Sequence, residues 1–309
     1  MTPNVAVIIN PISGTGGRMD VARARVERAA ALLAGRGLDA QVLVTERPGH
    51  ARELTQALLA QGVTTVVAWG GDGTVNEVAS ALAFRDATLA VIPSGSGNGL
   101  ARELQIPFDP ERALAVALGE RACRIDAGQL DGRLFFNVAG IGVDAHVAHR
   151  FAAGGLVRRG FFRYVQIAAR ELFTYTADCY TVVTDAAEVH VEPLLIAIAN
   201  GRQYGNGAII APAARLDDGR LDVVVVAGRS SLAALLQAPR LFTGQIAQVP
   251  GVTSVPATNI EVRSAHPVAY HVDGEPFVGG VSIAARVHPG ALRVSIAADA
   301  RLDLQRSAD

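Results

Sequence analysis

The sequence Gly70-Gly71-Asp72-Gly73-Thr74 has the residue types that could bind a phosphorylated ligand. Its three glycines let the backbone turn tightly and approach a ligand closely, because no Cβ stands in the way. Asp72 would repel a phosphate unless a divalent cation lay between the two groups, or unless the acid exchanged a proton with a substrate. Short glycine motifs often bind nothing, so the interpretation depends on what accompanies this one.

Two further loops have a similar composition, and all three loops follow apolar runs of strand length. One loop spans residues 10–17 after a run at 5–9, and another spans residues 93–99 after a run at 89–92. The ligands of parallel α/β sheets lie at the carboxyl ends of the strands. We therefore expect the three loops to converge at one edge of a sheet.

Helical spacing follows each loop. After the second loop, apolar residues recur at Val75, Val78, Ala79 and Leu82, which lie on one face of a helix. Thr74 is the predicted N-cap of this helix, and the N–H groups of its first turn would face a phosphate. Four such strand–helix repeats in the first third of the chain predict a doubly wound parallel sheet.

The pattern changes near residue 122, where short apolar segments alternate with turn residues. The predicted strands of this part are 122–130, 133–139, 177–184, 192–199, 221–226, 257–263, 268–272, 281–287 and 291–297. Asp131-Gly132 is a hairpin signal, and the whole pattern is typical of an antiparallel sandwich or barrel. We predict an α/β domain at residues 1–122, an antiparallel β-sandwich domain at 123–298 and a polar tail at 299–309.

Composition excludes several functions. The chain of 309 residues has a net charge of −1, which gives no electrostatic argument for nucleic acid as a partner. All 28 basic residues counted as lysine or arginine are arginine. A chain without lysine cannot form a Walker A loop, the strand lysine of protein kinases or a Schiff base. A bound phosphate must therefore be held by backbone N–H groups, hydroxyls, arginine and metal.

The sequence also gives expectations for the location of the protein, for its contact with membranes and for its cysteines. The N-terminus lacks the pattern of a signal peptide, and no apolar run approaches the about 20 residues that span a bilayer. We expect a cytoplasmic protein that can reach the inner membrane face. The basic, aromatic segment 151–173 either lies on an anionic bilayer or covers the sandwich with snorkelling arginines. Cys123 and Cys179 are predicted to be buried free thiols.

Two acid-rich turns in the second part could carry chemistry. Residues 216–222 include Asp217 and Asp218, which either form a solvated loop or supply hard oxygen ligands to a divalent cation. Asp273-Gly274-Glu275 is either a simple hairpin turn or the position of a general base for a substrate hydroxyl. The neighbouring His271 alternates along a strand and is interpreted as structural.

Taken together, these motifs resemble the diacylglycerol kinase catalytic-domain family of lipid kinases, whose first domain is similar to that of NAD kinases. The matching segments follow one another over nearly the whole chain, which makes the resemblance specific. They are residues 10–14, 70–77, 93–98, 136–145, 216–222 and 273–275. The resemblance implies an ATP-binding first domain and an antiparallel β second domain whose last strand returns to the first.

The resemblance also implies roles for individual residues. Glu275 would accept a proton, with Asp273 beside it as the alternative. A basic residue expected near the first loop would be Arg18. ATP would contact positions that match the family motifs, namely Asn10, Ser13, Gly14, Thr45, Gly70, Gly71, Asp72, Gly73, Thr74, Val75, Asn76 and Ser96.

A magnesium site is implied in the same way. Asp218 and the main-chain carbonyl groups of Arg215 and Arg220 would bind a structural magnesium ion. Asp72 and Asp126 would join a carboxylate–water–magnesium network.

One departure from the family pattern bears on the substrate. Asn98 is followed by Gly99, where many bacterial diacylglycerol kinases have an aspartate and sphingosine-kinase-like members do not. The predicted activity is ATP- and magnesium-dependent phosphorylation of a lipid hydroxyl, on diacylglycerol, sphingosine, ceramide or phosphatidylglycerol presented at a membrane surface. The alternatives are an NAD-kinase-type enzyme with a soluble substrate and a non-catalytic nucleotide- or lipid-binding module. A homodimer is compatible with the sequence.

Overall fold

The structure is a computed structural model that describes residues 4–14, 19–37, 40–119, 121–153, 170–171, 175–228, 236–298 and 300. The chain divides into two compact units. Among the described residues, one unit is built from those up to Ile125 together with residues 290–298 and 300, and the other from Asp126–Pro289. The chain passes from the first unit to the second within strand β5 (Ala122–Leu130) and returns within strand β18 (Ser282–Ser295).

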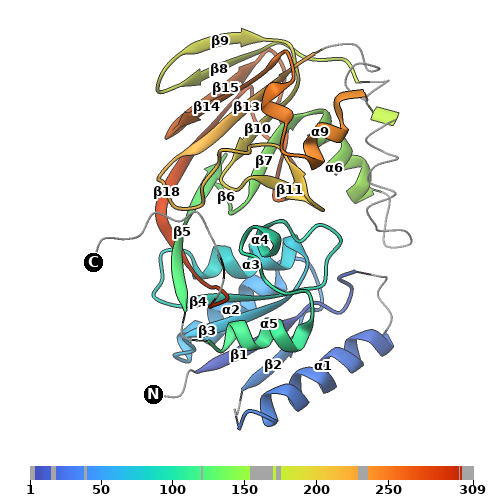
Figure 1. The fold of residues 1–309 in the computed structure, drawn as a ribbon, viewed down its shortest axis with the longest axis vertical. Coiled ribbons are helices and arrows are strands. Elements are labelled where there is room, and N and C mark those ends of the chain that lie inside the picture. The colour runs from blue at the N-terminus through green and yellow to red at the C-terminus, as the bar shows by residue number, and fades with distance from the viewer. Residues whose placement is uncertain are drawn as a thin grey trace. The chain divides into compact units, whose positions relative to one another are not determined.

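The first unit is a parallel α/β fold with strand order β2-β1-β3-β4 (Figure 1). Its strands are β1 (Val5–Ile9), β2 (Gln41–Val44), β3 (Thr65–Gly70) and β4 (Thr88–Pro93). Its helices are α1 (Met19–Ala34), α2 (His50–Ala60), α3 (Asp72–Leu82), α4 (Gly99–Glu103) and α5 (Pro110–Ala117). Nearly every residue of β1, β3 and β4 is buried, as expected for central parallel strands covered on both faces.

Strand register brings the ends of the strands to one level. Ile9 is the neighbour of Trp69, and Trp69 is the neighbour of Ile92. The loops that follow these three residues therefore begin side by side at the carboxyl edge of the sheet.

Two details of this unit differ from the sequence-based expectation. Helix α3 begins at Asp72 with Gly71 as its N-cap, so the prediction of Thr74 as N-cap is wrong. The glycines allow the chain to enter the helix earlier than the apolar spacing indicates. Helix α5 was not predicted. It begins with Pro110 after an Asp109 cap whose side chain accepts a hydrogen bond from the Arg112 N–H group.

The second unit contains two antiparallel sheets, which confirms the predicted β-sandwich domain. One sheet has the order β14-β13-β10-β7-β16-β17, and the other includes the sequence of neighbours β18-β15-β8-β9. The first sheet consists of β7 (Val138–Gly142), β10 (Pro193–Ala199), β13 (Leu221–Ala227), β14 (Val252–Ala257), β16 (Ala269–Val272) and β17 (Glu275–Val278). The others are β6 (Arg133–Phe135), β8 (Tyr180–Thr184), β9 (Glu188–Val191), β15 (Asn259–Ser264) and a small pair, β11 (Gln203–Gly205) and β12 (Ala208–Ile209).

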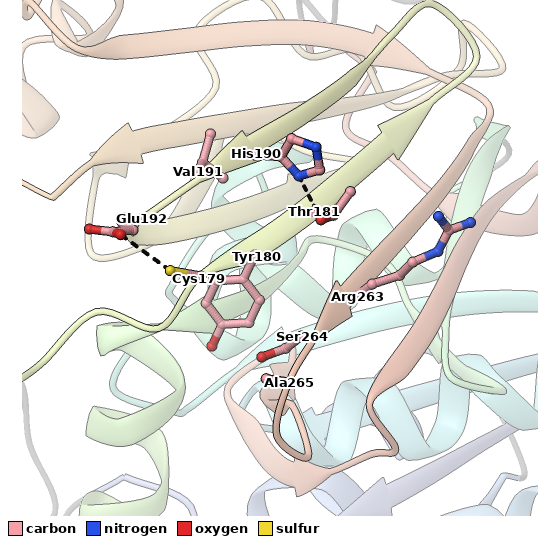
Figure 2. A pocket seen from close by; sticks show the side chains of 9 residues that line it. All are labelled: Cys179, Tyr180, Thr181, His190, Val191, Glu192, Arg263, Ser264 and Ala265. Carbon is pink, nitrogen blue, oxygen red and sulfur yellow. Dashed lines mark hydrogen bonds between the residues drawn. The ribbon is translucent and has the colours of Figure 1, made fainter.

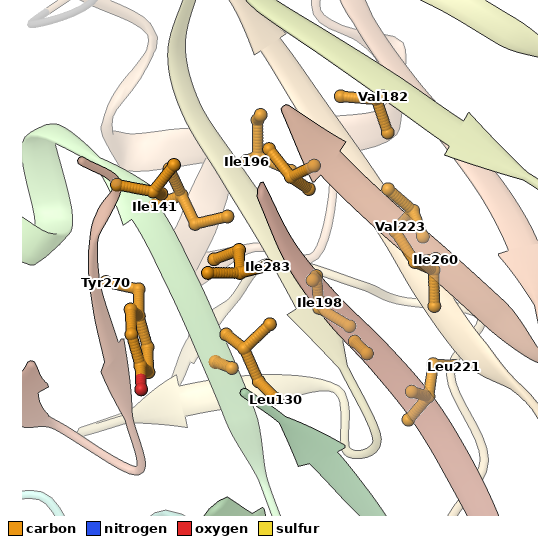
Figure 3. Packing of buried hydrophobic residues seen from close by; sticks show 14 of the residues in the cluster. Leu130, Ile141, Val182, Ile196, Ile198, Leu221, Val223, Ile260, Tyr270 and Ile283 are labelled. Atoms are coloured by element: carbon orange, nitrogen blue, oxygen red, sulfur yellow. The ribbon is translucent and has the colours of Figure 1, made fainter. Parts of the chain in front are cut away.

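The core of the second unit lies between these sheets (Figure 3). Ile141, Ile196 and Ile198 come from the first sheet and pack with Val182 and residues of the facing strands. All of these side chains are almost fully buried. Burial of each such side chain contributes about 1.5–3 kcal/mol, so the alternating apolar pattern of the sequence is sufficient to place the two sheets face to face.

Strand β18 shows where the segment boundaries were wrong. Two strands were predicted at 281–287 and 291–297, but a single strand runs through Pro289 and Gly290. Its first part pairs with β15 in an antiparallel ladder, and Arg293 and Val294 pair with β4 in parallel. Strand β9 was not predicted. The Asp131-Gly132 hairpin is present, with φ of 48° and 79° at the two residues, as a type I′ turn requires.

Other predictions concern surfaces and thiols. Helix α6 (Val143–Ala153) includes the first residues of the predicted basic, aromatic segment 151–173, and most of that segment lies outside the described residues. Arg18 and residues 301–309 of the predicted tail also lie outside them. Within the described part of the chain, no helix combines the length and the apolar character needed to cross a membrane.

Both cysteines are free thiols, but the prediction of burial is wrong. Cys123, near the start of β5, is half-buried, and Cys179, just before β8, is exposed.

Candidate active site

The first loop of the α/β unit is hydrogen-bonded to the second. The Asn10 N–H group donates to the carbonyl oxygen of Trp69 over 2.9 Å, and Asn10 Nδ2 donates to Thr74 Oγ1 over 2.7 Å. Asn10 Oδ1 accepts a hydrogen bond from the Ile12 N–H group. Asn10 therefore uses its side chain to hold its own turn and the start of helix α3 at the same time.

Arg25 of helix α1 holds the same loop from the other side. Its Nη1 atom donates to the Asn10 carbonyl oxygen and to Ser13 Oγ, and its Nη2 atom donates to the Ser13 carbonyl oxygen, each over 2.8 Å. Burial lowers the pKa of Arg25 from its usual value. Ser13 Oγ also lies 2.7 Å from Ser94 Oγ, which joins the first loop to the third. A Cβ on Gly14 would lie 2.6 Å from the Ser94 carbonyl oxygen, so the two loops pack too closely for a larger residue.

Asp72 joins the second loop to the third. Its carboxylate accepts hydrogen bonds from the backbone N–H groups of Asn98, over 2.9 Å, and of Gly99, over 2.7 Å. Asn98 is buried in the left-handed region with φ of 52°, and its side chain both accepts from and donates to the backbone of Gly95. The Asp72 carboxylate thus holds the third loop in its turn.

The backbones of these two loops also touch. A Cβ added to Gly95 would lie 2.6 Å from the Cα atom of Gly71, a separation that side-chain carbon atoms do not reach. The predicted convergence of loops 10–17, 70–74 and 93–99 is therefore seen as a set of direct contacts between their described residues, which leave out residues 15–17.

The remaining residues proposed to contact ATP fall into two groups. Thr74, Val75 and Asn76 are buried, and the Thr74 hydroxyl oxygen accepts the hydrogen bond from Asn10 that is described above. Gly73 and Ser96, in contrast, are exposed. Gly70 ends the buried strand β3, and Thr45 follows strand β2, where its N–H group donates to the Ile9 carbonyl oxygen. The groups available to an anion are thus the backbone of the second loop, the first-turn N–H groups of α3 and the Ser96 hydroxyl.

A hollow of about 480 Å³ adjoins these loops in the α/β unit. It lies beside helix α1 and the ends of β3 and β4, and it is lined by Val21, Ala24, Arg25, Arg28, Trp69, Pro93, Ser94 and Pro110.

In the second unit, Asp126 and the first acid-rich turn come together. Asp126 is buried, and its Oδ2 atom accepts a hydrogen bond from the Gly219 N–H group over 2.7 Å. Its own N–H group donates to the Leu216 carbonyl oxygen over 2.6 Å. Asp218 Oδ1 accepts a hydrogen bond from the Arg220 N–H group over 3.0 Å, which shapes the turn from within.

Two carboxyl groups of this turn, those of Asp218 and Asp222, influence each other. Burial and, to a lesser extent, the charge of Asp218 raise the pKa of the nearby Asp222 carboxyl. The described residues hold no group of three or more His, Cys, Asp or Glu side chains that could surround a metal ion. A cation here would depend on Asp218 and on main-chain carbonyl groups such as those of Arg215 and Arg220. Carboxylate and carbonyl oxygens suit magnesium, so the donor set fits that ion.

The two carboxylates of the second acid-rich turn have different surroundings. Asp273 accepts hydrogen bonds from the backbone N–H groups of Phe136, Asn137 and Val138 over 3.0–3.2 Å. Asp273 and Gly274 have φ of 46° and 85°, which makes the turn type I′. Glu275 begins strand β17 and is exposed. Asp273 therefore anchors the start of strand β7, while Glu275 faces solvent.

A larger hollow lies elsewhere in the second unit (Figure 2). It measures about 670 Å³ and is lined by residues of β8, β9 and β15 and their neighbours. Its polar side chains pair with one another: Cys179 Sγ donates to Glu192, which raises the pKa of the thiol, and Thr181 Oγ1 lies 2.8 Å from His190 Nδ1. Among the described residues, none of those predicted to act in catalysis lines this hollow, so it is not the candidate active site.

Sequence reasoning missed the structural role of three residues in or beside these loops and turns. Arg25 lies on α1, in a segment that carried only a helical pattern, and its reach to the first loop is a tertiary contact. Asn98 was noted only as part of a family match, although an asparagine between two glycines is a common left-handed residue. Asp222 was part of the acidic motif but was not given a role.

Two family models match the chain and together cover almost all of it. Residues 4–130 match the diacylglycerol kinase catalytic domain. Residues 137–296, which are more than half of the chain, match the YegS C-terminal NAD kinase beta sandwich-like domain.

Individual proteins give the same result. A protein of Pseudomonas aeruginosa named "Probable lipid kinase YegS-like" is 33% identical over 290 residues, which cover 86% of this chain and 87% of that protein. A protein of the same name from Pseudomonas fluorescens is 31% identical, with 86% and 88% covered. A crystal structure of a diacylglycerol kinase from Bacillus anthracis str. Sterne has the same fold, with a TM-score of 0.70, 21% identity and 96% and 97% of the two chains covered. The chain therefore belongs to the diacylglycerol kinase catalytic-domain family, in the group that carries the YegS C-terminal domain.

Proposed function

We propose that this lipid kinase transfers the γ-phosphate of ATP to the hydroxyl group of a lipid, with magnesium as the required ion. The observation that carries the proposal is the set of hydrogen bonds that joins the loops after β1, β3 and β4 at one edge of the sheet. Phosphoryl transfer requires mainly positioning and neutralisation of charge. Loops held in advance by Asn10, Arg25 and Asp72 supply the positioning.

The α/β unit would bind the nucleotide. Backbone N–H groups of residues 70–73 and the first turn of α3 would bind its phosphates, with the exposed Ser96 hydroxyl as a further donor. Asn10, Ser13, Gly14 and Thr45 would shape the site rather than supply its charge. With no lysine in the chain, arginine and magnesium carry the positive charge that the phosphates need.

Asp218 and the carbonyl groups of Arg215 and Arg220 would hold magnesium, next to Asp126. When bound, the ion would add positive charge beside the Asp218 and Asp222 carboxyl groups. Two buried oxygens, Asn137 Oδ1 and Asn200 Oδ1, have no hydrogen-bond partner among the described residues. Because the Asn200 amide donates to the Asp126 carbonyl oxygen, the Asn200 oxygen lies near the proposed site and could accept a further hydrogen bond there.

Glu275 is the proposed general base. It would take the proton from the lipid hydroxyl while the hydroxyl oxygen forms a bond to the γ-phosphorus and the bond from that phosphorus to the ADP oxygen breaks. Asp273 is less suited to this role, because three backbone N–H groups already occupy its oxygens. Its part is to hold the turn from which Glu275 projects.

The acceptor is a lipid with a free hydroxyl at a membrane surface, and the enzyme would act there as a peripheral protein at the inner face. The absence of an aspartate after Asn98 leaves sphingosine, ceramide and phosphatidylglycerol beside diacylglycerol as candidates. An NAD-kinase-type reaction is the second candidate, and its support is the matched NAD kinase-like sandwich.

The test is transfer of labelled γ-phosphate from ATP with magnesium. Mixed micelles would present diacylglycerol, sphingosine, ceramide and phosphatidylglycerol in separate reactions, and NAD would serve as the soluble acceptor. Label on one lipid supports the proposal and identifies the substrate. Label on NAD alone, or bound ATP without transfer to any acceptor, would contradict it.

A further inference from the structure

Three side chains of the second unit, the buried Asp144 and His271 and the half-buried Tyr204, form a polar chain that the proposed reaction does not use. Tyr204 Oη donates to Asp144 Oδ2 over 2.7 Å, and His271 Nε2 lies 3.2 Å from the same oxygen. Asp144 Oδ1 accepts from the Ala145 N–H group over 2.8 Å. Only 4% of the His271 side chain and 8% of the Asp144 side chain are exposed. A carboxylate so deeply buried is costly unless each donor is in place.

The surrounding backbone is shaped for this pair. His271 on β16 is the direct neighbour of Gly140 on β7. A Cβ on Gly140 would lie 2.0 Å from Asp144 Oδ2 and 2.5 Å from His271 Nε2, so the pair occupies the space that a side chain would fill. The glycine is thus required for the contact between the imidazole and the carboxylate.

The second ring nitrogen of His271 is bound to the proposed catalytic turn. The Gly274 N–H group donates to His271 Nδ1 over 3.3 Å. An Nδ1 atom that accepts a hydrogen bond carries no proton, so the neutral ring has its proton on Nε2 and donates it to Asp144. The Asp144 carboxylate therefore selects the tautomer whose other nitrogen can accept from Gly274.

We propose that His271 is a positioning residue for Glu275, held in the required tautomer and orientation by Asp144 and Tyr204. The Gly274 N–H group is bonded to the ring and Glu275 is the next residue, so the imidazole holds the backbone from which the base projects. Asp273 fixes the opposite side of the same turn through strand β7. The catalytic consequence rests on the proposed function, whereas the control of the turn does not.

Two substitutions separate the roles of the two ring nitrogens. His271→Asn keeps an acceptor near the Nδ1 position but loses the donor to Asp144. His271→Gln keeps a donor near the Nε2 position but loses the acceptor for Gly274. Tyr204→Phe, which removes one donor from Asp144 and leaves the ring in place, is the matched control.

The two variants should rank in opposite orders for activity and stability. His271→Gln should lower kcat by about tenfold to a hundredfold, as a small displacement of a catalytic group does, with the KM for ATP unchanged. His271→Asn should keep most of the kcat but have the lower melting temperature, because it leaves Asp144 buried with a donor missing. A kcat that follows the melting temperature across the three variants would overturn the proposal.

Hydrogen–deuterium exchange at the Gly274 amide gives a readout that needs no lipid substrate. Exchange should become faster in His271→Gln and stay close to wild type in His271→Asn. Unchanged protection in His271→Gln would overturn the proposal even in an active enzyme. If wild type phosphorylated no acceptor, the proposed function would fail, and the exchange pattern alone would still decide whether His271 controls the turn.

Discussion

The loops of the α/β unit and the acid-rich turns of the sandwich unit differ in how their polar groups are balanced. In the α/β unit, the Asp72 carboxylate is paired with two backbone N–H groups, and Arg25 is bound to two carbonyl oxygens and a hydroxyl. At the turn of the second unit, Asp218 and Asp222 lie close enough for one to raise the pKa of the other. The proposed function would place an anion at the first region and a cation at the second.

The carboxylates of these loops and turns are of two kinds. Asp72, Asp126 and Asp273 use their oxygens to hold backbone N–H groups from other segments. Glu275 is exposed at the start of a strand, and Asp218 lies on the turn itself. Loss of a carboxylate of the first kind should cost stability, while loss of one of the second kind should cost activity or metal binding and leave the fold intact.

Among the substitutions that distinguish the two kinds of carboxylate, Glu275→Gln should have the largest effect on activity. We expect kcat to fall by about 10²–10⁴-fold, the usual range for loss of a general base, with an unchanged melting temperature. The measurement is lipid phosphorylation together with thermal unfolding. Asp273→Asn is the control and should lose about 1–3 kcal/mol of stability, because an amide would direct its N–H groups toward backbone donors. Full activity in a folded Glu275→Gln protein would refute this assignment.

Asp72→Asn should affect both stability and activity. The amide can keep only part of the hydrogen bonding to Asn98 and Gly99, so we expect a loss of about 1–3 kcal/mol together with loss of turnover. Denaturant unfolding and phosphate transfer would be measured on the same preparation. Ser96→Ala is the matched control in the third loop; its exposed hydroxyl should matter for the KM of ATP and not for stability. Wild-type stability in Asp72→Asn would show that the carboxylate does not hold the third loop.

Magnesium should stabilise the wild-type protein in the absence of ATP. At saturating concentrations the gain should be about 1–3 kcal/mol, as mass action predicts for an ion that binds only the folded state. Asp218→Asn should abolish this gain, whereas Glu261→Gln, on strand β15 of the same unit, should retain it. The readout is the melting temperature as magnesium is titrated. An equal gain in Asp218→Asn would move the site away from this turn.

The smallest expected effect is the pH dependence of Asp222. Because its pKa is raised in the folded protein, the folded state favours the protonated form, and stability is lost as the pH rises above the ordinary value of 3.8 through the raised pKa. Asp222→Asn should therefore gain stability relative to wild type between pH 4 and pH 7, as followed by denaturant unfolding. Addition of magnesium should reduce the difference. A difference that does not vary with pH would mean that burial and Asp218 do not raise the pKa of Asp222 in the folded protein.

The local features of this protein could be predicted from the sequence because they depend on short-range rules. Glycine turns after buried strands, alternating apolar residues and the Asp131-Gly132 and Asp273-Gly274 hairpins each follow from local chemistry, and the parallel and antiparallel parts follow from the spacing of these elements. Errors occurred where a strand continues through residues that normally end one. Strand β18 passes through Pro289 and Gly290, and its pairing with two different strands outweighs that local preference.

The residue types and their spacing were enough to identify the glycine loops and the acid-rich turns as the candidates for chemistry. They also showed that a bound phosphate must be held without lysine. The tertiary structure is needed to show which of these groups hold distant segments in place. Asp273 and Glu275 are equivalent in sequence, yet three N–H groups from 136–138 reach Asp273 and leave Glu275 exposed. The same holds for His271, whose partner Asp144 lies 127 residues away. Hydrogen bonds over such separations depend on the register of paired strands, which no local pattern contains.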